Sequence, residues 1–233
     1  MKALVIVPAY NEGNNLEFVL ADLEGYSADV LVVNDGSMDA TEEVARRLGV
    51  ACVSHPVNLG IGGAVQTGLI YALRNGYDYA IQFDGDGQHQ ANQIGKLVTP
   101  VEQGAADLVI GVRTLEEGYK CGVSRKIGSV FFCFLIRCLT GKQVADPTAG
   151  FRCYGPHALR LFSLDYPDDY PEVESIITAS RNNLIITEVP VIMRQRQSGH
   201  SSINRRKSAY YMLKVSLAMC VDAMRGKINW KEV

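Results

Sequence analysis

Cysteine pairs are the first thing that this sequence lacks. Its six cysteines are scattered over 233 residues, and no two of them form a Cys-x-x-Cys pair. Such spacing disfavours both a zinc site and a disulfide framework. A reducing cytoplasm is therefore the expected compartment.

Long hydrophobic runs are also missing. No uninterrupted apolar run reaches the ~18 residues that a membrane-spanning helix needs. The apolar residues 3–7 stop at Pro8, too soon for a signal peptide. We expect a chain that is soluble or that lies on a membrane surface.

The common phosphate-binding glycine motifs are absent as well. Segment 58–69 contains four glycines, but their spacing does not fit G-x-G-x-x-G, and no G-x-x-x-x-G-K-[ST] segment occurs. Dinucleotide binding is disfavoured and P-loop chemistry is excluded.

Acidic residues are absent from 189–221, although the net charge of the whole chain is −2. The overall charge gives no reason to expect nucleic acid as a partner. The basic and partly apolar stretch predicts an anionic partner or a membrane surface. A solvated helix face is the alternative.

The chain does contain an alternation of short apolar runs and helical periodicity. Apolar runs predict strands over 3–10, 29–37, 51–55, 77–83 and 106–113. Helical spacing predicts helices over 14–24, 39–48, 62–76 and 91–103, the second with Asp39 as N-cap and Glu42 as its capping-box partner. Strands separated by helices indicate an α/β fold, with a mostly parallel sheet covered by helices on both faces.

Polar clusters follow several of these strands, at 8–12, 34–37, 84–86 and 111–113. Ligands of such sheets bind beyond the carboxyl ends of the strands. The sequence Asp84-Gly85-Asp86 does not fit an EF-hand loop, because His89 and Gly95 stand where glycine and glutamate are needed. Paired carboxylates favour Mg²⁺ or Mn²⁺ held against a diphosphate, and a plain surface turn is the alternative.

Eight motifs in order resemble glycosyltransferase family 2, with its GT-A nucleotide-sugar-binding fold. Within that family the chain is similar to the polyprenyl-phosphate sugar synthases of the dolichol-phosphate mannose synthase type. The motifs lie at 5–12, 32–41, 58–69, 83–89, 111–113, 124–129, 146–152 and 196–202.

The resemblance implies a set of site residues. Those implied to bind the donor nucleotide are Pro8, Ala9, Tyr10, Glu12, Asp35 and Asp84. Those implied to hold the metal are Asp84, Asp86 and Gln88. Those implied to receive the acceptor phosphate are Arg113, Arg125, Ser129 and Arg196. The implied catalytic set is Asp86, Arg113, Arg125, Asp146 and Arg196, and Arg152 lies with Asp146 on an acceptor-side loop.

The implied reaction is an inverting, metal-dependent transfer of a sugar. The donor is a nucleoside-diphosphate sugar, expected to be a UDP-sugar, and the acceptor is a polyprenyl phosphate such as undecaprenyl phosphate. Its products would serve the assembly of cell-envelope glycans. An ionised phosphate acceptor needs arginines more than it needs a base.

Two other functions stay open. A hydroxyl acceptor on a polysaccharide or glycolipid would need a carboxylate base, for which the chain offers Asp86, Asp146, Glu172 and Glu174. A non-catalytic nucleotide-sugar-binding protein is the alternative outside enzymes. Glu172 and Glu174 stand in "YPEVES", where the typical synthases carry a different sequence. Another departure is Ser202, which replaces a typical lysine. His89 and His200 are expected to be structural or solvent-facing rather than catalytic.

The expected organisation is one catalytic domain over residues 1–202, with a donor half over 1–113 and an acceptor half over 114–202. Residues 203–233 are expected to form an amphipathic helix. This helix and the apolar segment 127–141 would lie on the inner face of the cell membrane, unless they pack into the core or a homo-oligomer interface. The resemblance is to short forms without membrane helices, which implies a small integral membrane protein as a partner.

Overall fold

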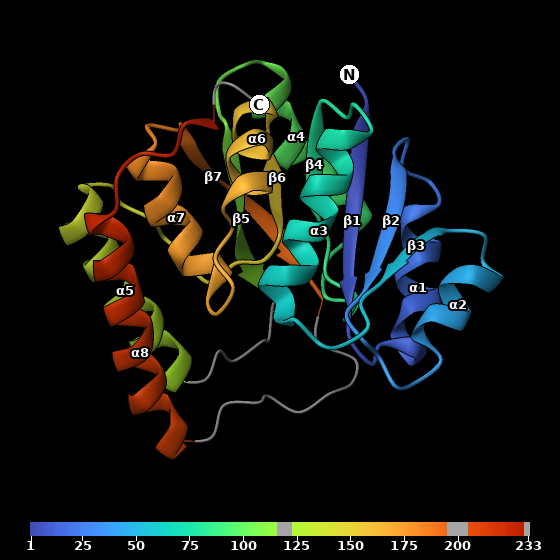
Figure 1. Ribbon diagram of the computed structural model, residues 1–233, viewed down its shortest axis with the longest axis horizontal. Coiled ribbons are helices and arrows are strands. Elements are labelled where there is room, and N and C mark those ends of the chain that lie inside the picture. The colour runs from blue at the N-terminus through green and yellow to red at the C-terminus, as the bar shows by residue number, and fades with distance from the viewer. Residues whose placement is uncertain (116–122, 195–204, 231–233) are drawn as a thin grey trace.

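The protein is built around one seven-stranded sheet (Figure 1). The computed structural model describes residues 1–115, 123–194 and 205–230, without the side chains of 114–115, 123–127 and 205–211. Its strands stand in the order β3-β2-β1-β4-β6-β5-β7, and only β6 runs antiparallel to its neighbours among the described pairings. The strands are β1 (Ala3–Ala9), β2 (Asp29–Asn34), β3 (Ala51–Ser54), β4 (Tyr79–Gln82), β5 (Leu108–Leu115), β6 (Arg152–Tyr154) and β7 (Ile186–Met193). The predicted mostly parallel sheet is confirmed.

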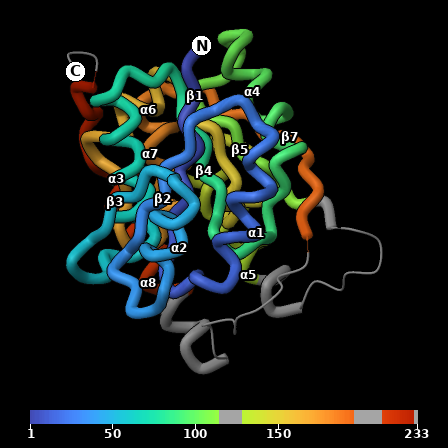
Figure 2. Tube along the Cα trace, turned by 90° about the vertical axis from the view of Figure 1, so that its right-hand side faces the viewer, coloured from blue at the N-terminus to red at the C-terminus, as the bar shows by residue number. Residues whose placement is uncertain are grey.

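Helices cover both faces of the sheet, as predicted. The helices are α1 (Gly13–Leu23), α2 (Thr41–Arg47), α3 (Gly60–Arg74), α4 (Ile94–Glu102), α5 (Val123–Thr140), α6 (Pro156–Leu164), α7 (Pro171–Arg181) and α8 (Arg205–Met224). A 3₁₀ turn (Ala91–Gln93) leads into α4. Figure 2 shows α3 and α6 on one side of the strands and α1 and α4 on the other.

The central strands are apolar throughout because both of their faces are buried. In β1, Leu4 and Ile6 belong to the core under α3 and α6, whereas Val5 and Val7 belong to the core under α1 and α4. Continuous apolar runs of this kind are typical of parallel strands between two helix layers. Gly68 of α3 lies so close to β1 that a Cβ there would overlap the Ile6 side chain.

The start of α2 differs from the predicted capping box. One Asp39 carboxylate oxygen accepts from the Thr41 N–H (3.0 Å), and the other accepts from the Gly13 N–H at the start of α1 (3.0 Å). Glu42 instead pairs with Arg46 one turn later in the helix (2.5 Å). The capping-box prediction is therefore wrong, because the helix begins at Thr41 with Ala40 as its N-cap and Glu42 bonds to Arg46 instead of reaching back.

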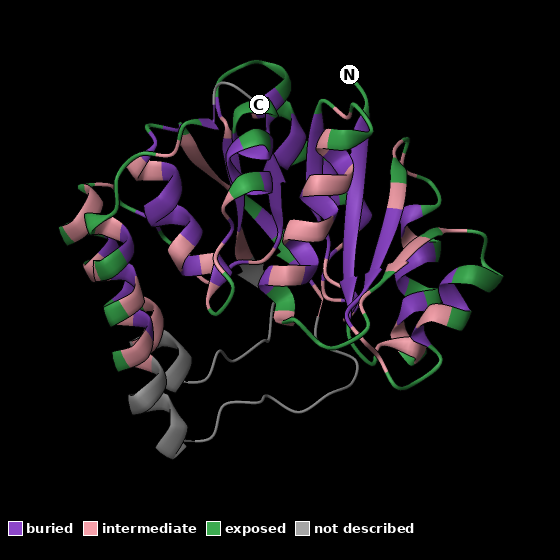
Figure 3. Cartoon of the chain, in the orientation of Figure 1, coloured by how far each residue is buried: buried purple, intermediate pink, exposed green. Residues whose placement is uncertain are grey.

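Helices α5 and α8 lie side by side beyond α7, at one end of the sheet (Figure 1). Val215 and Met219 of α8 are buried, and Phe132 and Ile136 of α5 are buried with them in one core. Large apolar side chains are nevertheless exposed on both helices, as the green segments of Figure 3 show. We call this the apolar patch, and its members are Val130, Phe131, Phe134, Leu213, Leu217, Val221 and Met224. No helix among the described residues is long and apolar enough to span a membrane.

Candidate functional site

A cleft of about 490 Å³ opens at the carboxyl ends of β1 and β4. It contains all six residues predicted to bind a donor nucleotide, together with Asp86. Its lining is Pro8, Ala9, Tyr10, Glu12, Asp35, Asn58, Gly60, Ile61, Ala64, Asp84, Gly85 and Asp86. Residues from three separate strand ends and from the start of α3 thus meet in one place, as expected for a sheet of this type.

The loop after β1 is held by the loop after β2. Asn11 adopts a left-handed backbone conformation (φ 55°), which is uncommon outside glycine. Its N–H donates to the Ser37 hydroxyl (2.9 Å), and its side-chain oxygen accepts from the Met38 N–H (2.9 Å). These bonds leave Tyr10 47% exposed at the cleft, where its ring can meet a ligand.

Asp35 is 3% exposed, and its carboxylate organises the far wall of the cleft. It accepts hydrogen bonds from the N–H groups of Leu59 (2.8 Å) and Gly60 (2.9 Å), where α3 begins. His55 Nδ1 lies 2.8 Å from the same carboxylate, and His55 Nε2 lies 2.9 Å from the Thr67 hydroxyl. His55 could not be predicted from the sequence, because no pattern near it marks this contact.

The turn after β4 presents two partly buried carboxylates to the cleft, Asp84 and Asp86. The Gln88 N–H donates to Asp86 Oδ1 (3.0 Å), and Gly87 between them takes the positive φ (77°) that the turn requires. The Gln88 carbonyl accepts from the Arg194 N–H (2.8 Å). Gln88 is thus anchored on the same turn, but it is not among the residues that line the cleft.

His89 supports this turn from behind. The Asp84 N–H donates to His89 Nδ1 (2.9 Å), and His89 Nε2 lies 3.6 Å from Asp84 Oδ2. The ring is buried and stacks on Phe151, with 4.5 Å between ring centroids. Burial lowers the pKa of His89, more than the nearby carboxylates raise it, so the neutral imidazole is favoured. The structural role predicted for His89 is confirmed, with the addition that it positions Asp84.

A buried polar chain reaches Asp84 from the sheet. Gln82 Nε2 donates to Asp84 Oδ1 (3.2 Å), and the Tyr154 hydroxyl donates to Gln82 Oε1 (3.0 Å). The Tyr166 hydroxyl lies 2.9 Å from that of Tyr154. Burial raises the pKa of Tyr154 to about 12, so this phenol keeps its proton and remains a donor at neutral pH.

The predicted acceptor-side loop is locked by an ion pair. Arg113 Nε and Nη2 donate to the two Asp146 carboxylate oxygens (2.7 and 3.0 Å), and Nη2 also donates to the Thr148 hydroxyl (2.7 Å). Burial alone would raise the pKa of Asp146, but the Arg113 charge and hydrogen bonds outweigh it and lower that pKa. The structure thus brings two predicted catalytic residues together, with Arg113 already engaged by a carboxylate.

Arg152 is fully buried and joins this loop to α7. Its guanidinium donates to the carbonyls of Ala149 (2.7 Å) and Glu172 (2.6 Å) and to the Ser175 hydroxyl (2.6 Å). A more distant contact reaches the Pro147 carbonyl (3.4 Å). Arg152 therefore fixes the position of the acceptor-side loop rather than facing a ligand.

The remaining predicted residues lie at or beyond the edge of the described structure. Ser129 is on α5, one turn before Cys133, whose thiol donates to the Ala145 carbonyl (3.7 Å). The Arg125 side chain and Arg196 lie outside the described residues, as do His200 and Ser202.

The residues present fit a divalent metal that is shared with a substrate. Within the described ranges, no group of three or more His, Cys, Asp or Glu side chains could hold an ion by itself. Mg²⁺ and related ions are commonly bound by one or two carboxylates, with phosphate oxygens and water completing the shell. Asp84 and Asp86 at the cleft supply that kind of partial ligand set.

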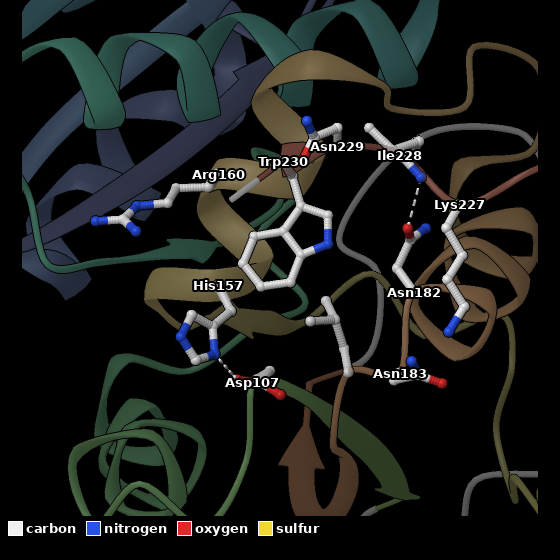
Figure 4. Close-up of a pocket in the computed structure, with 10 residues that line it drawn as sticks. Asp107, His157, Arg160, Asn182, Asn183, Lys227, Ile228, Asn229 and Trp230 are labelled. Atoms are coloured by element: carbon white, nitrogen blue, oxygen red, sulfur yellow. Dashed lines mark hydrogen bonds and ion pairs between the residues drawn. The ribbon is translucent and has the colours of Figure 1, made fainter. Parts of the chain in front are cut away.

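A larger cavity, of about 650 Å³, lies away from these residues (Figure 4). It is bordered by the start of β5, the start of α6 and the segment after α8, and Trp230 forms one wall. Its acidic residue, Asp107, already interacts with His157 Nδ1 (2.9 Å) and accepts from the Ile185 N–H (2.7 Å). None of the predicted site residues lines it. Cavity size therefore does not mark the candidate active site here.

Comparison with known proteins identifies the family of the chain. The family model of glycosyl transferase family 2 matches residues 4–164. An undecaprenyl-phosphate mannosyltransferase of Micrococcus luteus is 33% identical over 216 residues, which cover 88% of each chain. A UDP-N-acetylglucosamine–dolichyl-phosphate N-acetylglucosaminyltransferase of Methanococcus voltae is 31% identical over 209 residues, covering 80% of this chain and 83% of that one.

A solved structure shares the fold. Glucosyl-3-phosphoglycerate synthase of Mycobacterium tuberculosis, crystallised with Mn²⁺, UDP and phosphoglyceric acid, superimposes with a TM-score of 0.72. The match covers 96% of this chain and 78% of that one at 22% identity, so it supports the GT-A fold alone.

Proposed function

The chain belongs to glycosyl transferase family 2 and is a glycosyltransferase, and we propose that it transfers a sugar from a nucleoside-diphosphate sugar to a polyprenyl phosphate. The observation that carries this proposal is the cleft in which Asp84 and Asp86 meet the residues that end β1 and β2. The named polyprenyl-phosphate relatives support the acceptor, since both are more than 30% identical to most of this chain.

In this proposal the donor nucleotide lies along the loops of Pro8–Glu12 and Asp35, with its diphosphate at Asp84 and Asp86. Mg²⁺ or Mn²⁺, when bound there, would neutralise the charge that grows on the leaving diphosphate. His89 and Gln82 hold Asp84 in place before the substrate arrives, and the absence of a side chain at Gly150 leaves room for the Asp84 carboxylate. Such preorganisation lowers the cost of reaching the transition state.

The acceptor would enter over the loop that Arg113 and Asp146 lock together. A phosphate oxygen is already ionised at neutral pH, so it attacks the anomeric carbon without a strong base while the nucleoside diphosphate leaves. The family resemblance implies a single, inverting displacement. Arg125 and Arg196 complete the proposed phosphate site, because guanidinium groups match phosphate in a forked geometry. A UDP-sugar is our first choice of donor and GDP-mannose the second.

The apolar patch on α5 and α8 supports attachment to a membrane surface. Leu213, Leu217, Val221 and Met224 recur every three or four residues, so they form one stripe along α8. Large exposed apolar side chains gathered on one face of a helix are typical of a membrane or protein contact. We place the protein at the inner face of the cell membrane, next to its lipid acceptor, with a small integral membrane protein as a further candidate partner.

A hydroxyl acceptor is the second candidate, because burial raises the pKa of the Glu172 carboxyl, on which the charges of Asp84 and Arg113 also act. A carboxylate in that state could serve as a general base. The relatives favour the phosphate acceptor.

The test is sugar transfer from labelled UDP- and GDP-sugars to a membrane extract that contains polyprenyl phosphate. We expect label in an acid-labile lipid with Mg²⁺ or Mn²⁺ present, and none with EDTA. An Asp86→Asn variant that folds normally should behave like the EDTA sample. Label in polymer or in an acid-stable glycolipid would contradict the lipid-phosphate acceptor, and metal-independent transfer would contradict the role of Asp84 and Asp86.

A further inference from the structure

His55 follows β3 directly, and its side chain is only 9% exposed. Its N–H donates to the Asn34 carbonyl (2.9 Å), which continues the pairing of β3 with β2. Val53, two residues earlier, packs into the core under α3 and α6. Because side chains alternate along a strand, the His55 ring lies on the same side of the sheet as α3.

The partners of the ring fix its protonation state. The Thr67 hydroxyl donates its proton to the Gly63 carbonyl (2.9 Å), so it can only accept from His55 Nε2 (2.9 Å). On the other side, Nδ1 faces Asp35 Oδ1 (2.8 Å). The Asp35 carboxylate also accepts from two backbone N–H groups, an arrangement that favours its ionised form. An ionised carboxylate only accepts hydrogen bonds, so both ring nitrogens of His55 donate and the ring is an imidazolium.

Other charged groups do not replace Asp35 as the partner of this ring. Segment 56–59 and the part of α3 from Gly60 to Thr67 carry no charged side chain, and Tyr71 and Arg74 lie further along the helix. Cys52, the other titratable residue of β3, packs into the core on the opposite face of the sheet. His55 and Asp35 therefore form a buried pair of opposite charges.

The hydrogen bonds of Asp35 leave one of its oxygens available to a ligand. Oδ1 accepts from His55 and from the Leu59 N–H, whereas Oδ2 accepts from the Gly60 N–H alone among the described residues. Each carboxylate oxygen has about two acceptor positions, so Oδ2 keeps one. Asp35 borders the cleft. A group that meets Oδ2 there has to be a donor, which a nucleoside supplies and a phosphate does not.

We propose that His55 is a positioning residue for the donor nucleotide. Its imidazolium keeps the Asp35 carboxylate ionised and fixed, so that Oδ2 accepts a hydrogen bond from the nucleoside. Without this charge, burial would favour the protonated form of Asp35, and without the Nδ1 bond the carboxylate would lose one of its fixed partners. The inference rests on the proposed use of a nucleoside-diphosphate donor.

Nitrogen NMR tests the ring itself, with no ligand present. The chain has four histidines, so the His55 signals can be identified as those missing from a His55→Asn variant. At pH 7 we expect both ring nitrogens of His55 to carry a proton. A neutral His55 ring at pH 7 would overturn the inference.

Calorimetry in Mg²⁺ then compares UDP, GDP and inorganic pyrophosphate for wild type, His55→Ala, His55→Asn and His157→Ala. His157→Ala is the matched control, because His157 Nδ1 makes the same kind of contact with Asp107 (2.9 Å) away from the cleft. The nucleotide that wild type binds more tightly should bind about ten-fold more weakly to His55→Ala. His55→Asn, which keeps an N–H donor near the position of Nδ1, should recover part of that loss. His157→Ala should bind as wild type does, and pyrophosphate should not distinguish the four proteins.

Two binding results would also overturn the inference. Nucleotide binding by His55→Ala that equals wild type would show that Asp35 does not depend on His55. An equal loss of pyrophosphate and nucleotide binding would indicate a general distortion of the cleft. A wild type that binds neither nucleotide would instead contradict the proposed donor, and the NMR measurement separates that failure from a failure of the His55 assignment.

Discussion

Replacing Glu174 with glutamine should stabilise the protein in alkaline but not in acidic solution. Glu174 is on α7 and, together with residues of α8, borders a polar cavity of about 200 Å³. Its Oε1 atom is buried without a partner among the described residues. Burial raises the pKa of Glu174 to about 7, helped by the charges of Asp222 and Asp169. The other charged groups around the cavity or in contact with its members are Asp165, Asp168, Arg181, Lys214 and Arg225.

The sign of the effect follows from the two pKa values. In the unfolded chain Glu174 loses its proton near its ordinary pKa of 4.5, but in the folded protein it keeps the proton until about 7. The folded state therefore binds more protons between these values, and the free energy of unfolding falls as the pH rises through this window. Because the pKa rises from 4.5 to about 7 on folding, Glu174 lowers the free energy of unfolding by about 3 kcal/mol above pH 7. Near pH 5 it lowers it by less than about 1 kcal/mol.

The assay is urea unfolding of wild type and Glu174→Gln at about pH 5 and about pH 8. The free energy of unfolding of the variant, relative to that of wild type, should be about 2 to 3 kcal/mol higher at pH 8 than at pH 5. The m-value should be the same for both proteins. Glu42→Gln is the matched control, since Glu42 is on the exposed side of α2 and pairs only with exposed Arg46. Equal pH dependence of wild type and Glu174→Gln would refute the argument that burial of this carboxyl destabilises the fold.

Three further predictions concern the cleft and the apolar patch. Gly150→Ala should displace the Asp84 carboxylate and weaken Mn²⁺-dependent UDP binding by about ten-fold. Gly95→Ala, which has open space around it, should leave that binding unchanged. Equal UDP binding by both variants in calorimetry would contradict this steric argument. Asp35→Ala should lower the free energy of unfolding by about 2 kcal/mol, because the Leu59 and Gly60 N–H groups at the start of α3 lose their acceptor. An unchanged melting temperature would argue against a stabilising role for these hydrogen bonds. Leu217→Glu should abolish sedimentation with anionic vesicles. Leu164→Glu, the same substitution at an exposed leucine of α6 outside the apolar patch, should leave sedimentation unchanged. Sedimentation retained by Leu217→Glu would exclude the apolar patch as the membrane contact.

Local pattern was enough to predict the elements that form the donor side. Strands β1, β2 and β4 each contain a short apolar run that is followed by polar residues, so periodicity and turn chemistry agree there. The polar residues that line the cleft could be located from the sequence for the same reason. Parallel strands deliver their carboxyl ends to one edge, whatever the details of their packing.

Contacts between distant segments could not be predicted in this way. Strand β6 has only three residues, and its conformation is set by pairing with β4 and β5 rather than by a pattern of its own. Tyr154 supports Gln82 across 72 positions, and nothing near either residue marks the bond. Arg152 shows the same limit, because its motif indicated the right loop but not that the guanidinium is buried under α7.

The place of β6 has a consequence for how the chain can be divided. Residues 152–154 come from the acceptor half, yet they fill the gap between two strands of the donor half. A fragment ending near residue 113 would leave the edges of β4 and β5 unpaired, and unpaired strand edges promote aggregation. Residues 1–113 are therefore not a transplantable module, and a chimera with a relative should join outside residues 79–154.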